Sequence, residues 1–281
     1  MQAFKRYLQS MLKRAGVYYR VKNSYVYDLY WRIADKRLIG ARSKELEFYR
    51  SLLNGFRQGD LIFDVGANVG DKTDLFLRLG TRVVSIEPDE ANQEVLRDRF
   101  LRYRLAPKRV VIVGKAVSDR SAIETMWIDG PGSAVNTLSQ KWAETLKSNK
   151  DNFEHGHFGL EFARSKAVET TTLEELIITH GLPLFVKIDV EGYEASVVRG
   201  LKRPVPFLSF EINLPEFRQE GLDCVRLLDG LAADGKFNYA ADLQAGMQGN
   251  WVGAREFSSV IEQCSERTIE VFWRTPLAQG R

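Results

Sequence analysis

The sequence has little cysteine and no long apolar run. Its 281 residues contain two cysteines, Cys224 and Cys264, which are about 40 residues apart and outside any C-x-x-C pair. This spacing argues against a disulfide framework and against a structural zinc site, so we expect a reducing, cytoplasmic compartment. No apolar run approaches the roughly 20 residues that a membrane span needs. The basic N-terminus lacks the apolar segment of a secretory signal.

The chain also lacks a large excess of either charge. It has 40 basic and 37 acidic side chains, a net charge of +3, but residues 1–22 contain six basic side chains and no acidic one. Nucleic-acid binding needs a basic stripe across the fold and is not expected. Apolar spacing predicts a basic amphipathic helix over residues 3–15. This segment either packs on the domain or makes peripheral contact with anionic lipid or an acidic acceptor.

From residue 61, short apolar runs alternate with helical spacing. Apolar runs at 61–66, 82–88 and 109–117 predict strands, and the segments 71–79 and 89–103 between them predict helices. This alternation indicates βαβ units and a parallel sheet. Further strands are expected at 122–128, 184–190, 206–212 and 269–275, the last pairing antiparallel with 237–243.

We expect two parts in the chain. Residues 1–59 read as a helical N-terminal extension, with helices at 25–39 and 43–54, and residues 60–281 as the α/β domain. The domain is interrupted by a polar, irregular insertion at about 130–166. A loop of that length is usually functional.

The loop after the first predicted strand, Asp64 to Gly70, has the position of a nucleotide-binding turn. A dinucleotide fingerprint requires G-x-G-x-x-G, and Asn68 occupies its middle glycine position. Asp64, two residues before Gly66, would repel a phosphate and attract an amino or sulfonium group. The loop therefore disfavours a dehydrogenase, although a plain strand–helix turn stays the alternative.

The second predicted strand ends at Glu87, which is placed to accept the hydroxyls of a ribose. Dehydrogenases share this feature, so Glu87 alone does not choose a cofactor. Glu87, Asp64 and the missing glycine together indicate a particular kind of cofactor. It is a nucleoside that has no phosphate groups and that carries an amino acid and a positive charge. S-adenosylmethionine has this chemistry.

The run 186–194 places charges on a strand that should be buried. Lys187, Asp189 and Glu191 share one face, where charges are costly unless they are paired. Lys187 is either a catalytic group or part of an ion pair, perhaps with Glu211. Asp189 is expected near the reacting end of the cofactor. Glu191 either orients or deprotonates a substrate hydroxyl or caps the predicted helix at 194–201, with capping slightly favoured.

Other ionisable groups give weaker signals. Asp189 and Glu191 have no obvious third ligand, so no metal site is expected. His155 and His157 lie in the polar insertion and are candidate general bases, because histidine titrates near neutrality. His180 precedes Gly181 and is expected to end a helix.

Several ordered motifs together resemble one family. They are FDVGANVG (63–70), SIEPDEAN (85–92), GKAVSD (114–119), VETTTLEELI (168–177) and VKIDVEGYEASVVRGL (186–201). With these the chain resembles the FkbM-type family of S-adenosylmethionine-dependent methyltransferases over about residues 60–212. The resemblance implies a class I methyltransferase fold, Rossmann-like, with a seven-stranded, mostly parallel sheet, helices on both faces and an antiparallel last strand.

The resemblance also implies roles for individual residues and an activity. Asp64, Gly66, Ala67, Asn68 and Gly70 would surround the methionine part, and Thr73 would approach its carboxylate. Glu87 would hold the ribose hydroxyls and Pro88 would shape that turn. Val117 and Ser118 would flank the adenine, and Asp189 would face the amino or sulfonium end. The implied activity is methylation of a hydroxyl on a sugar, a glycan, a glycolipid or a secondary metabolite. The alternatives are methylation of nitrogen or a carboxylate, and a catalytically silent protein that docks to a membrane or a partner.

Overall fold

The structure is a computed structural model that describes residues 36–105, 109–148 and 162–278. The predicted helix at 3–15, most of the one at 25–39, and His155 and His157 lie outside these residues. Within them, the main sheet has eight strands in the order β10-β9-β11-β8-β7-β1-β2-β3. The strands are β1 (Leu61–Val65), β2 (Arg82–Ile86), β3 (Val110–Val113), β7 (Phe185–Ile188), β8 (Phe207–Asn213), β9 (Lys236–Ala240), β10 (Gln248–Val252) and β11 (Thr268–Arg274).

The sheet is mostly parallel, as predicted. β1 pairs in parallel with β2 and β7, whereas β11 lies antiparallel between β8 and β9. The expected pairing of 237–243 with the last strand is therefore confirmed. The predicted seven strands are present in this part of the chain, and β10 adds an eighth at the edge beside β9.

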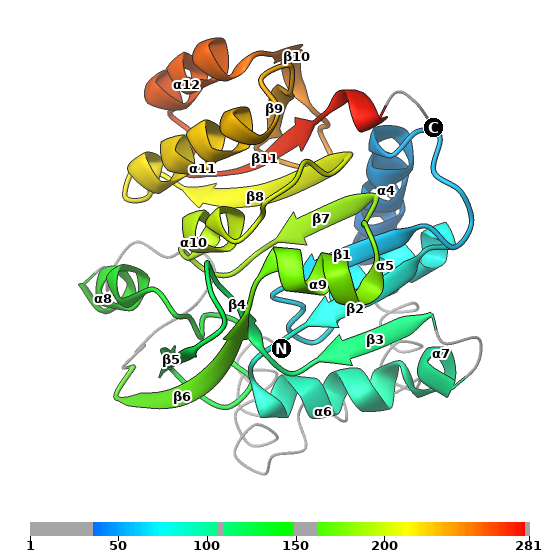
Figure 1. The fold of residues 1–281 in the computed structure, drawn as a ribbon, viewed down its shortest axis with the longest axis vertical. Helices are drawn as coiled ribbons and strands as arrows, with labels where there is room; N and C mark the ends of the chain where they lie inside the picture. Colours follow the sequence, from blue (N-terminus) through cyan, green and yellow to red (C-terminus); the bar gives the residue numbers. More distant parts are fainter. Residues whose placement is uncertain (1–35, 106–108, 149–161, 279–281) are drawn as a thin grey trace.

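Helices cover both faces of the sheet (Figure 1). α4 (Lys36–Leu52), α5 (Asp71–Leu79) and α6 (Glu90–Arg99) pack on one face around Tyr49, Phe76 and Phe100. The opposite face carries α9 (Leu173–His180), α10 (Glu194–Arg199), α11 (Arg218–Leu231) and α12 (Ala254–Gln263). α7 (Leu101–Leu105) follows α6, and a short 3-10 helix covers Pro276–Ala278. No helix in the described part of the chain is long and apolar enough to cross a membrane.

Two predicted elements are divided in the structure. The prediction that residues 109–117 form a single strand is wrong. β3 ends at Val113, and the chain continues as β4 (Ala116–Val117), which belongs to a second sheet. Gly114 lies at this break, where a Cβ atom would come within 2.7 Å of Gln93 Oε1. The helix predicted at 89–103 is likewise two helices, α6 and α7, separated at Phe100, which is buried.

The predicted insertion at 130–166 is partly regular structure. β5 (Ile123–Ile128), which was predicted, pairs antiparallel with β6 (Arg164–Thr171), which was not. With β4 these strands form a small sheet of three strands within the described residues. α8 (Gln140–Ser148) was also missed, although Trp142 and Leu146 on it are buried. Figure 1 shows this small sheet below the carboxyl ends of the central strands.

Candidate functional site

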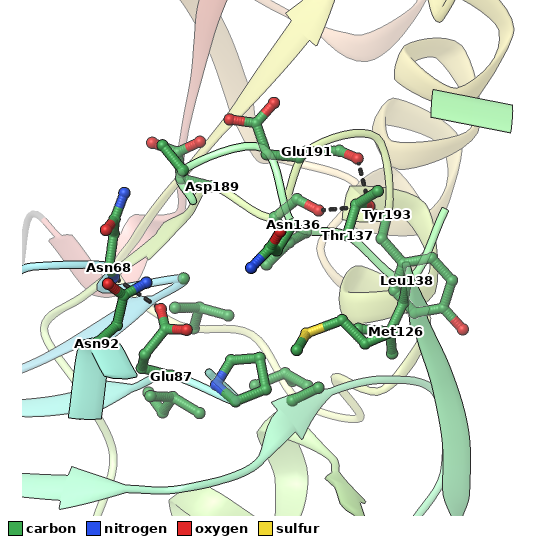
Figure 2. A pocket seen from close by; sticks show the side chains of 18 of the residues that line it. Asn68, Glu87, Asn92, Met126, Asn136, Thr137, Leu138, Asp189, Glu191 and Tyr193 are labelled. Carbon is green, nitrogen blue, oxygen red and sulfur yellow. Dashed lines mark hydrogen bonds between the residues drawn. The ribbon is translucent and has the colours of Figure 1, made fainter. Parts of the chain in front are cut away.

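A cavity of about 220 Å³ lies at the carboxyl ends of β1, β2 and β7 (Figure 2). Its floor is formed by the loops after these three strands, and its far wall comes from the small sheet and from residues 129–139, which we call the strap. The lining residues are Val65, Gly66, Asn68, Ile86, Glu87, Pro88, Asn92, Lys115, Ala116, Val117, Met126, Ser133, Ala134, Asn136, Thr137, Leu138, Asp189, Val190, Glu191 and Tyr193.

The loop after β1 requires unusual backbone conformations. Gly66 has a φ of 79°, Asn68 of 48° and Gly70 of 84°, all in the left-handed region. A Cβ atom on Gly66 would lie 1.8 Å from the carbonyl oxygen of Asp189. The loops after β1 and β7 are therefore in direct backbone contact, and this contact needs glycine.

Glu87 is held by the loops around it. Its Oε2 accepts a hydrogen bond from the Asn68 N–H and its Oε1 one from the Asp89 N–H, each at 2.8 Å. Burial raises the pKa of Glu87 to about 7, while the hydrogen bonds from Asp89, Asn68 and Asn92 act to lower it. The Glu87 side chain is thus fixed in position at one side of the cavity, at the end of the second predicted strand.

Asp64 lies behind the cavity and does not line it. It is 2% exposed, and its Oδ2 accepts a 2.6 Å hydrogen bond from the Thr73 hydroxyl, which also contacts Ser85 at 2.7 Å. Burial raises the pKa of Asp64 to about 6 against the opposing effects of Thr73 and Lys187. Thr73 is itself 0% exposed and does not line the cavity, because its hydroxyl points to Asp64, so the position expected for it beside a ligand carboxylate is wrong.

Three other predicted cofactor residues also lie outside the cavity lining. Gly70 packs against Phe100, where a Cβ atom would come within 2.5 Å of the ring. Ala67 is buried. Ser118 donates to Glu124 at 2.8 Å and contacts the Tyr193 hydroxyl at 3.3 Å, so it supports the wall from behind. The other predicted cofactor residues, Gly66, Asn68, Glu87, Pro88, Val117 and Asp189, line the cavity.

The strap is fastened to both sides of the floor. The Asn136 amide donates a 2.8 Å hydrogen bond to Asp89 Oδ2, and the Gly132 N–H donates to the same oxygen at 3.2 Å. On the other side the Thr137 hydroxyl donates to the Glu191 carbonyl at 2.7 Å (Figure 2). These contacts close the cavity over Glu87 and beside Asp189.

Behind Asp189 lies an ion cluster around Lys187, which is 1% exposed and does not itself line the cavity. Its Nζ lies 3.2 Å from Asp189 Oδ2 and 3.7 Å from Glu270 Oε1. Burial by itself lowers the pKa of this ammonium group. The carboxylates of Asp189, Glu270 and Glu211 outweigh burial and hold the pKa above its usual range. The expected ion pair is present, but Asp189 and Glu270, not Glu211, are its contact partners.

Two roles were considered for Glu191, one at the start of the following helix and one at the substrate. In the structure the first position is taken by Glu194. Glu194 Oε1 accepts hydrogen bonds from the Val190 and Gly192 N–H groups at 3.2 Å, so it holds the turn before α10. The capping role favoured for Glu191 is therefore wrong. Glu191 lines the cavity instead, and burial together with Asp189 and Glu211 raises its pKa well above the ordinary value.

The remaining candidates contribute less. His180 ends α9, as expected, and its ring packs edge-on against Phe63 at 6.4 Å. No group of three or more metal-ligating side chains occurs in the parts of the chain that the structure describes. The cavity residues that the sequence did not indicate are Val65, Ile86, Asn92, Lys115, Ala116, Met126, Ser133, Ala134, Asn136, Thr137, Leu138, Val190 and Tyr193.

Comparison with known proteins gives the family. The FkbM methyltransferase domain matches residues 64–237. The fold is similar to that of the FkbM methyltransferase from Methylobacillus flagellatus, with 17% identity and a TM-score of 0.50 over 82% of this chain and 47% of that one, so this chain spans about half of that protein. Precorrin-6y C5,15-methyltransferase from Geobacter metallireducens is less similar, with 10% identity and a TM-score of 0.39 over 83% and 86% of the two chains. No curated protein matches the sequence. Because the domain match covers more than half of the chain, the protein belongs to the FkbM methyltransferase family.

Proposed function

We propose that the protein is an S-adenosylmethionine-dependent methyltransferase that methylates a hydroxyl group of a sugar, glycan or other metabolite. The observation that carries the proposal is the position of Glu87. It is a fixed, buried carboxylate at the carboxyl end of β2, and it lines a cavity whose floor is the Gly66–Asn68 turn.

The cavity residues fit the parts of this cofactor. Apolar side chains of Val117, Met126 and Leu138 form a wall suited to an adenine ring. Glu87 is placed for the ribose hydroxyls. Asp189 lines the opposite side, where a carboxylate favours an ammonium or sulfonium group. When bound, S-adenosylmethionine supplies an electrophilic methyl group on sulfur.

The carboxylates beside the ion cluster can act on the hydroxyl group of the methyl acceptor. Asp189 and Glu191 border the cavity, and Lys187 orients the Asp189 carboxylate from behind. Either carboxylate can accept the proton of an alcohol as its oxygen is methylated, and holding that oxygen in line contributes most of the rate. His155 and His157 stay candidate bases, and contact of residues 1–22 with a membrane stays a prediction.

Cofactor binding and acceptor choice are tested separately. Titration calorimetry with S-adenosylhomocysteine should give saturable binding to the wild type. Glu87→Gln should weaken this binding at least about tenfold, because its amide group cannot accept both backbone N–H bonds and a ribose hydroxyl. The control is Glu94→Gln, which changes an exposed carboxylate on α6. Absence of binding to the wild type would disprove use of this cofactor.

The methyl acceptor is identified by incubating the protein with labelled S-adenosylmethionine and with separate glycan, lipid and small-metabolite fractions, and by measuring which fraction gains label. Label in an ether that resists mild alkali supports hydroxyl methylation. Label released by alkali as methanol, or label on an amine, would instead support the carboxylate or nitrogen alternatives and overturn this part of the proposal.

A further inference from the structure

Lys187 is shared by two carboxylates that belong to different parts of the structure. Its Nζ lies 3.2 Å from Oδ2 of Asp189, which lines the cavity. The same Nζ lies 3.7 Å from Oε1 of Glu270, which is on β11 and does not line the cavity. One positive charge between two negative charges leaves this group of three side chains with an excess of negative charge.

Glu270 is held beside Lys187 from the core side of the sheet. Its Oε1 accepts a hydrogen bond from the Ser209 hydroxyl at 2.8 Å and one from the Tyr49 hydroxyl at 3.4 Å. Both donors are buried, and the Glu270 side chain is 11% exposed. Its charge therefore acts on Lys187 with little screening by water.

The excess negative charge is open to the cavity at Asp189, whose side chain is 36% exposed. Oδ2 of this carboxylate faces Lys187, whereas Oδ1 has no hydrogen-bond or ion-pair partner among the residues that the structure describes. Asp189 and Lys187 alone would form a neutral pair. Because Glu270 balances part of the charge of the lysine, Asp189 keeps an unbalanced negative charge on the side of the cavity.

Glu211 is the third carboxyl group that acts on Lys187. Burial, and then the charge of Asp189, raises the pKa of Glu211 to about 8, so this group is mostly protonated at neutral pH. The charge of Lys187 is therefore balanced by Asp189 and Glu270.

We propose that Glu270 is a specificity residue for the charge of the cofactor: by sharing Lys187 with Asp189, it leaves a negative charge at the cavity that favours the cationic methyl donor over the neutral thioether product. This inference rests on the proposed cofactor. S-adenosylmethionine carries a positive sulfonium group, whereas S-adenosylhomocysteine has an uncharged thioether in its place. A residue that does not line the cavity thus helps to exchange product for donor.

The test is titration calorimetry at neutral pH with S-adenosylmethionine and S-adenosylhomocysteine. Its readout is the Kd of S-adenosylhomocysteine divided by the Kd of S-adenosylmethionine. Glu270→Gln leaves Lys187 balanced by Asp189 alone, so this ratio should fall about threefold or more. Lys187→Met removes the positive charge and should raise the ratio by a similar factor. The double variant has the same net charge as the wild type and should return the ratio close to its wild-type value.

The ratio separates an effect of charge from a loss of structure. A variant that only distorts the cavity weakens the binding of both compounds alike and leaves the ratio unchanged. Glu262→Gln, an exposed change on α12, removes the same charge far from Lys187 in the sequence and should keep the wild-type ratio. An unchanged ratio in Glu270→Gln, or a change in the same direction in both single variants, would overturn the inference.

Glu270→Gln and the double variant leave no unbalanced charge beside Ser209 and Tyr49, so they test the inference even if Lys187→Met does not fold. In that case the ratio must fall in Glu270→Gln and recover in the double variant. Failure of the wild type to bind either compound would instead reject the proposed function. Binding of both compounds with a ratio that does not depend on Glu270 rejects only the role of Glu270, so the two failures are distinguishable.

Discussion

The Nζ of Lys187 lies 3.2 Å from Oδ2 of Asp189, and the two side chains differ sharply in exposure, at 2% and 36%. On the inner side the same ammonium lies 3.7 Å from Glu270, which accepts hydrogen bonds from Ser209 at 2.8 Å and Tyr49 at 3.4 Å. A buried cation thus connects the core of the sheet to a carboxylate that lines the cavity.

Lys187→Met should lower the free energy of unfolding by about 3–5 kcal/mol, because it leaves Glu270 buried without its counter-charge. Urea denaturation measures this change, and Lys202→Met, an exposed lysine, should stay within about 0.5 kcal/mol of the wild type. Adding Glu270→Gln to Lys187→Met should recover part of the loss. Equal effects of the two lysine substitutions would show that the ion cluster does not stabilise the fold.

Gly66→Ala should destabilise the protein far more than Gly59→Ala. Both glycines have positive φ, at 79° and 87°, so alanine pays a similar backbone cost of about 1 kcal/mol at each. Only at Gly66 does the new Cβ meet an atom, the Asp189 carbonyl oxygen at 1.8 Å, whereas nothing lies within 4 Å at Gly59. Thermal unfolding of the pair measures the difference, and similar melting temperatures would contradict the contact between the two loops.

The stability should depend on pH through Glu211. Burial, and then the charge of Asp189, raises its pKa to about 8, with Lys187 opposing. As the pH rises, the unfolded chain ionises near its ordinary pKa and the folded chain only near pH 8. The contribution of protonated Glu211 to the free energy of unfolding is therefore complete below the pKa that Glu211 has in the unfolded chain. It is lost as the pH rises from that value to about 8.

Glu211→Gln removes this loss, because an amide does not ionise. Relative to the wild type, the variant should gain about 1–3 kcal/mol of stability between pH 5 and pH 8. Denaturation at both pH values measures the gain. Glu262→Gln, an exposed change on α12, should show no such gain, and a gain of the same size there would assign the effect to general charge.

Asn136→Asp should release the strap. The new carboxylate would face Asp89 Oδ2, to which the amide now donates at 2.8 Å. Like charges at that distance repel, so we expect binding of S-adenosylhomocysteine to weaken about tenfold with little change in melting temperature. Gln140→Glu adds the same charge at an exposed position of α8 and serves as the control. Unchanged affinity in Asn136→Asp would show that fastening of the strap to Asp89 does not contribute to ligand binding.

The elements that could be predicted from the sequence are those whose apolar spacing and terminating residues are visible within the segment itself. α5 begins at Asp71 and ends at Leu79 before Gly80, as expected, because its apolar spacing and its glycine stop agree. β6 could not be found in this way, because Arg164, Ser165 and Lys166 at its start are exposed and give no alternation. The break between β3 and β4 lies where Gly114 comes close to Gln93, a tertiary proximity that the local sequence pattern does not indicate.

The same distinction applies to the site. Glu87 and Asp189 were predictable because they directly follow parallel strands, whose carboxyl ends meet at one edge. Asn68 was predictable because it lies in the glycine-containing loop after the first of these strands. Thr73 was misplaced, because its spacing does not tell whether the side chain faces the cavity or Asp64. Asn136 carries no motif, and its role depends on how the strap returns to Asp89.

Asp89 uses its two oxygens for separate purposes. Oδ1 caps α6 through the Ala91 and Asn92 N–H groups, and Oδ2 holds only the strap, through Gly132 and Asn136. Releasing the strap on this side therefore breaks two hydrogen bonds and leaves the first turn of α6 capped. Movement of the strap on this side can therefore change access to the cavity while the first turn of α6 and the Glu87 side chain keep their positions.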